Sequence, residues 1–140
     1  MKRTLAVISL LILSLFLLSM SLSCAADKIT ASLGQEFTLP VGQKAVIEGE
    51  ELTIKFVEVI SDSRCPAGVE CVWAGEAQCR LLFTYVGSPA EMVIVQPGGG
   101  ASAKDYFIMY KVVFKLEPYP QGGQQIAASE YKLLMTVTKK

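Results

Sequence analysis

The sequence predicts an all-β fold, and three observations lead to that prediction. Beyond residue 34, apolar residues recur at every second position rather than with the 3.6-residue period of a helix. β-Branched and aromatic residues lie in short runs separated by Gly and Pro. No window of eleven or more residues in this part of the chain has an apolar stripe at helical spacing. We therefore expect short strands joined by turns.

The first three predicted strands end at turn residues or alternate clearly. Residues 35–39 stop at Pro40, and residues 44–47 stop at Gly49. Residues 52–60 alternate between apolar and polar positions, so one face is expected to point inward. That face comprises Leu52, Ile54, Phe56 and Ile60.

The fourth and fifth predicted strands are joined by a turn. Residues 72–85 form a long strand in which alternate side chains, from Ala77 to Tyr85, are expected to point inward. The chain then turns at 87–89, because Gly, Ser and Pro favour reversal there. Residues 91–96 form the next strand, and the Pro-Gly-Gly-Gly run that follows it favours a mobile connection between two sheets.

The last two predicted strands complete the domain. Residues 106–117 alternate most clearly of all, with Tyr106 and Ile108 at the start of the inward face, and residues 131–137 form the seventh strand. Seven short strands fit a two-sheet β-sandwich of the immunoglobulin-like type, and a small β-barrel is the alternative. We assign residues 35–140 to this single domain.

The amino-terminal segment has the three parts of a secretory signal peptide. A basic pair at 2–3 precedes an apolar run at 5–18, and small residues follow. The run Ser21-Leu22-Ser23-Cys24 resembles a prokaryotic lipoprotein box. This resemblance implies a signal peptide at 1–23 and a lipid on Cys24 that anchors the protein in a membrane.

Residues 24–34 would then form a short tether between the anchor and the domain. One alternative is cleavage after Ala26, which releases a secreted protein, and another is an uncleaved membrane anchor. Each interpretation places the domain outside the cytoplasm, either as a membrane-anchored lipoprotein or as a secreted protein.

The composition excludes several classes of function. The chain contains no His, so it cannot form a Ser-His-Asp triad, a Cys-His pair or an imidazole metal site. Without the basic pair of the signal segment, 11 basic residues remain against 13 acidic ones, a net charge of about −2 that does not suit nucleic acid. We therefore expect no enzyme, no cofactor and no nucleic-acid partner. An enzyme that acts through a carboxylate stays open, because Glu58 interrupts the inward row of its strand.

The most distinctive run, residues 62–77, contains Cys65 and Cys71. Five residues separate these cysteines, among them a Pro and a Gly that favour reversal, and in an oxidising compartment this spacing favours a disulfide that closes a loop. A redox pair and a cysteine metal site that also uses Cys79 are the alternatives. A Ca²⁺ site is a third alternative, with carboxylates from Asp62, Glu70 and Glu76.

Three further side chains of this run have two interpretations each. Cys79 is expected to be a buried free thiol, and a Cys24–Cys79 bridge stays possible if Cys24 carries no lipid. Trp73 is expected to pack its indole under the loop as a core anchor, with ligand stacking as the alternative. The Arg64 guanidinium is expected to bind an internal carboxylate, with an anionic partner as the alternative. The internal candidates are Asp62, Glu70 and Glu76.

Residues 117–125 form a second candidate contact segment. A plain connection between strands is the favoured interpretation, and the alternative is that Pro118 and Pro120 favour an extended backbone that presents Tyr119 to a partner. The candidate partner contacts are therefore Arg64, Glu70, Trp73, Pro118, Tyr119 and Pro120.

Parts of the chain resemble two groups of proteins. The first is a group of small, uncharacterised secreted proteins and lipoproteins of prokaryotes, and this resemblance implies an exported β domain without a known activity. It is carried by Ser63-Arg64-Cys65-Pro66, Cys71-Val72-Trp73-Ala74-Gly75, Phe37-Thr38-Leu39, Val41-Gly42-Gln43 and Pro118-Tyr119-Pro120. The second group is the chagasin-type inhibitors of papain-like proteases, which Leu39-Pro40-Val41-Gly42-Gln43 and Pro118-Tyr119 resemble.

The sequence thus predicts an exported, envelope-associated β-sandwich that acts as a binding or structural module. Its partner is an unidentified protein or small molecule. A chagasin-like protease inhibitor is the alternative that the second resemblance implies.

Overall fold

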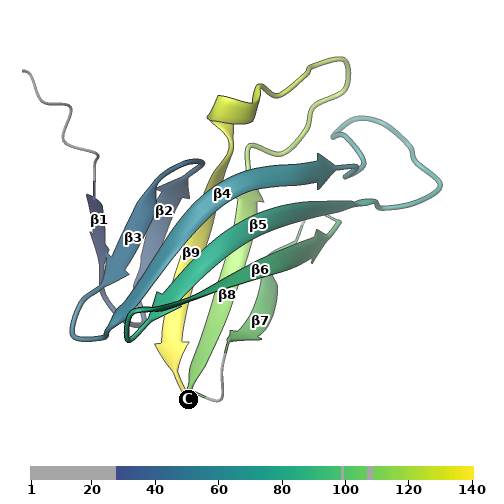
Figure 1. Ribbon diagram of the computed structural model, residues 1–140. Coiled ribbons are helices and arrows are strands. Elements are labelled where there is room, and N and C mark those ends of the chain that lie inside the picture. The colour runs from purple at the N-terminus through teal and green to yellow at the C-terminus, as the bar shows by residue number, and fades with distance from the viewer. Residues whose placement is uncertain (1–27, 99, 107–108) are drawn as a thin grey trace, which may run out of the picture.

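The computed structural model describes residues 28–98, 100–106 and 109–140, which form two β-sheets packed face to face (Figure 1). The strands are β1 (Lys28–Ala31), β2 (Glu36–Pro40), β3 (Lys44–Ile47), β4 (Leu52–Asp62), β5 (Glu76–Tyr85), β6 (Ser88–Pro97), β7 (Ser102–Tyr106), β8 (Tyr110–Glu117) and β9 (Lys132–Lys139). One sheet has the order β1-β3-β4-β5-β6 and the other the order β2-β9-β8-β7. The all-β sandwich is therefore confirmed, and the barrel alternative is wrong because neither described sheet closes on itself.

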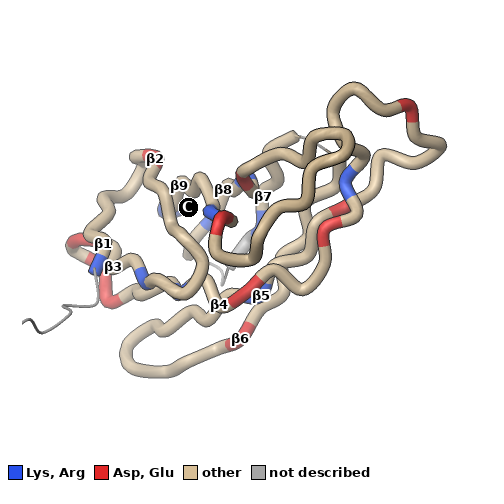
Figure 2. Tube along the Cα trace, turned by 90° about the horizontal axis from the view of Figure 1, so that it is seen from above, with Lys and Arg blue, Asp and Glu red and all other residues tan. Residues whose placement is uncertain are grey.

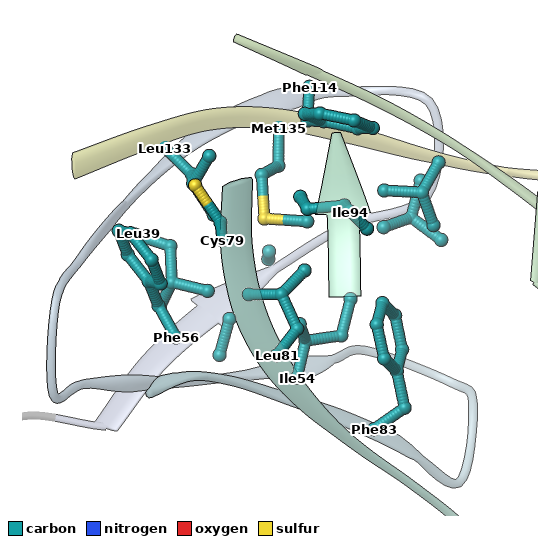
Figure 3. Packing of buried hydrophobic residues seen from close by; sticks show 14 of the residues in the cluster. Leu39, Ile54, Phe56, Cys79, Leu81, Phe83, Ile94, Phe114, Leu133 and Met135 are labelled. Carbon is teal, nitrogen blue, oxygen red and sulfur yellow. The ribbon is translucent and has the colours of Figure 1, made fainter. Parts of the chain in front are cut away.

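The core lies between the two sheets and is built from alternate positions of their strands. Figure 3 shows Leu81 and Phe83 of β5 together with Leu133 and Met135 of β9 in this shared interior. All four side chains are buried. The period-two pattern of the sequence therefore identified the inward face of β5 and β9 correctly.

Two strands were not predicted. β1 lies inside the range 24–34 that the sequence assigned to a tether, and it pairs in parallel with β3. β7 includes Tyr106, where the predicted strand 106–117 begins, and the predicted inward residue Ile108 lies outside the described residues. Tyr106 pairs with Tyr110, and β7 and β8 run antiparallel, so the predicted strand is wrong in its first part. A continuous alternation does not reveal such a reversal, since each arm of the hairpin keeps the same period.

The predicted strand 52–60 needs a correction in its second half. β4 and β5 shift register between Phe56 and Glu58 and again between Val59 and Ser61. A bulge inserts an extra residue and reverses which side chains point inward. Val59 therefore packs against the core, whereas Ile60 is exposed and not inward as predicted. Glu58 also lies outside the inward row, which removes the reason for considering it a buried catalytic carboxylate.

The turn between β5 and β6 is shorter than predicted. It consists of Val86 and Gly87, whose φ angles are 48° and 76°. Two positive φ angles are typical of the type I′ turn, which matches the twist of a two-residue hairpin. β6 therefore begins at Ser88 and extends beyond both ends of the predicted strand 91–96. At the other end of the hairpin, β5 begins at Glu76, so residues 72–75 belong to a loop and not to the strand.

The predicted signal peptide and the lipidation site Cys24 lie outside the described residues. In the part of the chain that is described, no helix has the length and apolar character needed to cross a bilayer.

Candidate functional site

Residues 63–75 connect β4 and β5 and project beyond the end of the sandwich (Figure 1). We call this segment the cysteine loop. Cys65 and Cys71 form a disulfide within it, with their Cα atoms 5.9 Å apart, as the spacing predicted. Because the two sulfurs are bonded to each other, neither a dithiol redox pair nor a metal site formed with Cys79 describes this state.

The base of the cysteine loop is closed by backbone contacts. The Ser63 amide donates to the Glu76 carbonyl at 2.8 Å, and the Cys65 amide donates to the Ala74 carbonyl at 2.9 Å. Between these pairs, Gly75 has a φ of +69°, and a Cβ atom there would lie 1.8 Å from the Ser63 carbonyl oxygen. Only glycine fits at this position.

Arg64 lies beneath the loop and is only 2% exposed. Its Nε and Nη2 donate to the two carboxylate oxygens of Asp62 at 2.8 and 2.6 Å. Nη1 donates to the Leu116 carbonyl at 2.7 Å, and Nη2 also donates to the Pro118 carbonyl at 2.9 Å. The internal pair that the sequence favoured is therefore confirmed, with Asp62 as the carboxylate. The assignment of Arg64 as a partner contact needs correction, because its guanidinium is buried.

The carboxylate of Asp62 is bonded on more than one side. The Tyr131 hydroxyl donates to Asp62 Oδ2 at 3.1 Å, in addition to the bonds from Arg64. Burial by itself raises the pKa of Asp62, but the hydrogen bonds and charge of Arg64 outweigh it and hold that pKa below its usual value. Burial, with the neighbouring Asp62 charge, raises the pKa of Tyr131 to about 12. Asp62 is thus occupied by Arg64 and Tyr131, which argues against its use in the alternative Ca²⁺ site.

Tyr119 faces the cysteine loop and not the solvent. Its hydroxyl donates to the Cys65 carbonyl at 2.7 Å, and its ring centre lies 5.1 Å from the Arg64 guanidinium carbon. The Ala67 amide donates to the Pro120 carbonyl at 2.9 Å, so the two segments are also joined through their backbones. Pro118, Tyr119 and Pro120 are half-buried. The prediction that this segment presents Tyr119 to a partner is therefore corrected: the segment supports the cysteine loop.

Trp73 is 82% exposed, which contradicts its predicted role as a core anchor. Arg64 and the Tyr119 ring, and not the indole of Trp73, lie beneath the loop. Next to Trp73, Val72 is 92% exposed, and Val69 on the other side of the disulfide is 47% exposed. We call Val69, Val72 and Trp73 the apolar tip. Neither valine was predicted as a contact, although the adjacent apolar residues Val72 and Trp73 directly after Cys71 were a usable signal.

The charges near the apolar tip are negative. Glu70 lies at the tip and is exposed, and Glu76 is half-buried where β5 begins (Figure 2). The only basic residue of the loop is Arg64, which Asp62 neutralises. The solvent-facing part of the loop therefore combines apolar side chains with acidic ones.

A cleft of about 460 Å³ lies between the base of the loop and residues 120–131. Its lining includes Asp62, which accepts hydrogen bonds from both Arg64 and Tyr131. The charges of Asp62 and Arg64 are already paired, so they offer no free charge to a ligand. Among the described side chains, no group of three or more His, Cys, Asp or Glu residues is placed to hold a metal ion.

Cys79 is a free thiol in the core, as predicted. Burial raises its pKa to about 12, so it carries no thiolate at neutral pH. Glu58, the other candidate for chemistry, is exposed and accepts a hydrogen bond from Arg80 Nη1 at 2.6 Å. Neither side chain has the environment of an activated catalytic group.

Comparison of the chain with protein-family models, with curated proteins and with solved structures finds no match.

Proposed function

We propose that the protein is an exported, envelope-associated binding module that holds a protein partner on its apolar tip. The exposure of Val72 and Trp73 on a loop that is closed by a disulfide carries this proposal. Burial of a whole large apolar side chain by a partner contributes about 1.5–3 kcal/mol of favourable free energy, relative to leaving that side chain in water. Trp is also one of the residue types that are enriched among the dominant contacts of protein interfaces.

The support beneath the tip favours binding over mere exposure. The disulfide, the Arg64 bonds and the Tyr119 bond hold the loop in one conformation before any partner arrives. A loop that is already ordered loses less conformational entropy on binding than a flexible one. The buried pair of Arg64 and Asp62 therefore contributes to binding indirectly, because it fixes the shape of the loop that carries the apolar tip.

The charge around the tip supports a protein partner with an apolar pocket and a basic rim. Glu70 is the exposed charge nearest to Val69 and Cys71, and no exposed Lys or Arg lies in residues 62–76. Acidic residues disfavour insertion of this tip into an anionic lipid surface. Opposite charges across an interface favour encounter with a basic partner.

The site can be tested by photo-cross-linking in the native host. A photoreactive amino acid replaces Trp73 in the full chain, and the matched control carries it at Val86, an exposed apolar residue in the turn between β5 and β6. We expect a discrete cross-linked protein from position 73 that is absent at position 86. Trp73→Ala should weaken copurification of that same protein, and Val86→Ala should not. Equal products from both positions would refute the assignment.

The location proposed for the protein rests on the sequence, and the disulfide is compatible with it. We propose that Cys24 becomes the first residue of the mature chain and carries lipid. The intact mass of the protein from its host tests this directly. A mass that begins at Cys24 with acyl chains supports the anchor, whereas a lipid-free chain that begins at Asp27 refutes it.

A chagasin-like protease inhibitor is the second candidate, favoured by one observation. The cysteine loop and the segment that follows β8 lie at the same end of the sandwich, where they form a joint surface (Figure 1). Inhibition of a papain-like protease by micromolar protein would support this candidate. Full protease activity at that concentration would exclude it and leave the binding module.

A further inference from the structure

β6 differs from the other strands at the edges of the two described sheets. β1, β2 and β7 are four or five residues long, whereas β6 has ten. Short length, lysine and proline usually protect a sheet edge from further pairing. β1 carries Lys28 and β7 carries Lys104. β6 contains no Lys or Arg, its two prolines, Pro89 and Pro97, stand at its second and last positions, and its Val93 and Val95 are 43% and 40% exposed.

The backbone groups on the outer side of β6 can be identified from its hairpin. In a two-residue turn, the residues flanking the turn form a hydrogen-bonded pair, here Tyr85 and Ser88. Bonded and non-bonded pairs then alternate along an antiparallel ladder. The bond from the Gly98 amide to the Gly75 carbonyl, 2.9 Å, continues the same alternation at the far end. The backbone N–H and C=O groups of even-numbered β6 residues therefore form hydrogen bonds with β5. Those of odd-numbered residues point to the outer side of the strand.

This assignment places both prolines of β6 at outward positions. Pro89 and Pro97 have no N–H, so their location at outward positions costs no bond with β5. Outward N–H groups remain on Glu91, Val93 and Val95. In the described residues no strand pairs with this side of β6, and Figure 2 shows the strand along the outer margin of the molecule.

We propose that β6 pairs in antiparallel fashion with β6 of a second copy of this chain, about a two-fold axis at Val93. The two five-stranded sheets then join into one continuous sheet. The proposal concerns a surface other than the apolar tip and does not rest on the function proposed above.

The outer edge of β6 is complementary to itself in this register. Pro89 and Pro97 are each four residues from Val93, so each proline faces the other proline of the second copy. Every outward N–H then faces a carbonyl, because Val93 pairs with Val93 and Glu91 pairs with Val95. Glu91 also lies 3.3 Å from the Arg80 guanidinium of its own chain. No like charges are therefore placed opposite each other. The Val93 side chains of the two copies come together on the exposed face, and each Val95 lies opposite Glu91 of the other copy.

A disulfide trap tests both the pairing and the register. Paired residues bonded to each other in an antiparallel ladder have Cα atoms about 5.5 Å apart, within the range that a disulfide spans. The full chain with Val93→Cys is purified in mild detergent and oxidised with copper phenanthroline. We expect a disulfide-linked dimer through position 93. The full chain with Val86→Cys, and the unchanged chain, should give no such product, because Val86 lies far from the axis.

A charge exchange provides an independent measurement. Sedimentation of the unchanged full chain should show a reversible dimer that dissociates on dilution. Val93→Lys and Val93→Glu should each sediment as monomers, since the axis places like charges together, and their mixture should recover a heterodimer. A monomer at all concentrations for the unchanged chain would overturn the proposal. So would dimers in both single variants, or a Val93→Cys trap that yields no more dimer than Val86→Cys.

Discussion

The buried ion pair under the cysteine loop leads to a quantitative prediction. Arg64→Met removes two bonds to the Asp62 carboxylate and two bonds to the carbonyls of Leu116 and Pro118. It also leaves a carboxylate, 8% exposed, without its cation. Hydrogen bonds to charged groups are each worth about 1.5–3 kcal/mol. Because the four bonds are not independent, we expect a loss of about 3–5 kcal/mol in the free energy of unfolding, as is typical for a broken buried pair.

Arg80→Met is the matched control. Arg80 donates to Glu58 at the same 2.6 Å distance that Arg64 has to Asp62, but the side chains of this second pair are 37% and 50% exposed. Exposed ion pairs contribute about 0–1 kcal/mol. Urea unfolding followed by far-UV circular dichroism measures both variants. If Arg64→Met lost no more stability than Arg80→Met, the proposed stabilisation of the fold by the buried bonds of Arg64 would be refuted.

The ion pair of Arg64 and Asp62 also makes stability depend on pH. The free energy of unfolding that Arg64→Met loses relative to the wild type should change with pH. In the wild type, the hydrogen bonds of Arg64 overcome the burial of Asp62 and hold its pKa below the unfolded value of about 3.9. Such a group stabilises the fold above the unfolded pKa, and this stabilisation is lost as pH falls through the folded pKa. In Arg64→Met, protonation instead relieves an unpaired carboxylate. The stability difference should therefore shrink from pH 7 to pH 3, and a constant difference would contradict this electrostatic origin.

Three further predictions concern single side chains. Gly75→Ala should unfold the loop base or prevent folding, because its Cβ would overlap the Ser63 carbonyl. Gly68→Ala is the control, because Gly68 has a similar φ and open space around it, and it should lower the free energy of unfolding by only about 1 kcal/mol in a thermal melt. Cys79 should resist alkylation by iodoacetamide at pH 8 until the protein unfolds, since its thiol is buried and its pKa is about 12; rapid native labelling would contradict this. Trp73→Ala should change the free energy of unfolding by less than about 0.5 kcal/mol, because the indole is 82% exposed, and a larger loss would show that the indole packs on the domain.

The periodicity of the sequence predicted the fold well where one face of a strand is buried throughout. It identified β5 and β9 and the inward side chains between Ala77 and Tyr85, because alternation records burial directly. It failed at Ile60, where a bulge reverses the inward face without changing the composition of the strand. It also missed β1, because residues 28–31 lie inside the range 24–34 that was assigned to a tether after the signal peptide.

The candidate site was predicted in its local parts, which are the disulfide and the ion pair of Arg64 with a nearby carboxylate. The spacing of Cys65 and Cys71 was sufficient for the disulfide, because that bond depends on local chain reversal. The burial of Arg64 depends instead on contacts more than 50 residues away, such as its bond to the Leu116 carbonyl, and Trp73 is left exposed. A buried arginine and an exposed tryptophan reverse the usual burial preferences of both residue types, and only the tertiary structure explains this exchange.

The two proposed surfaces belong to neighbouring parts of the five-stranded sheet, because the apolar tip lies on the loop before β5 and the proposed dimer edge is β6. β5 leaves the cysteine loop and β6 returns to it, since the Gly98 amide bonds to Gly75 at the loop base. Antiparallel pairing of two β6 strands places the loop end of one copy beside the hairpin turn of the other. The two apolar tips then lie at opposite ends of the joined sheet and point away from each other. Such a dimer holds two partners apart and does not bring both tips to one partner, so Val93→Lys should lower the number of partners bound per assembly from two to one and leave the affinity of each tip unchanged.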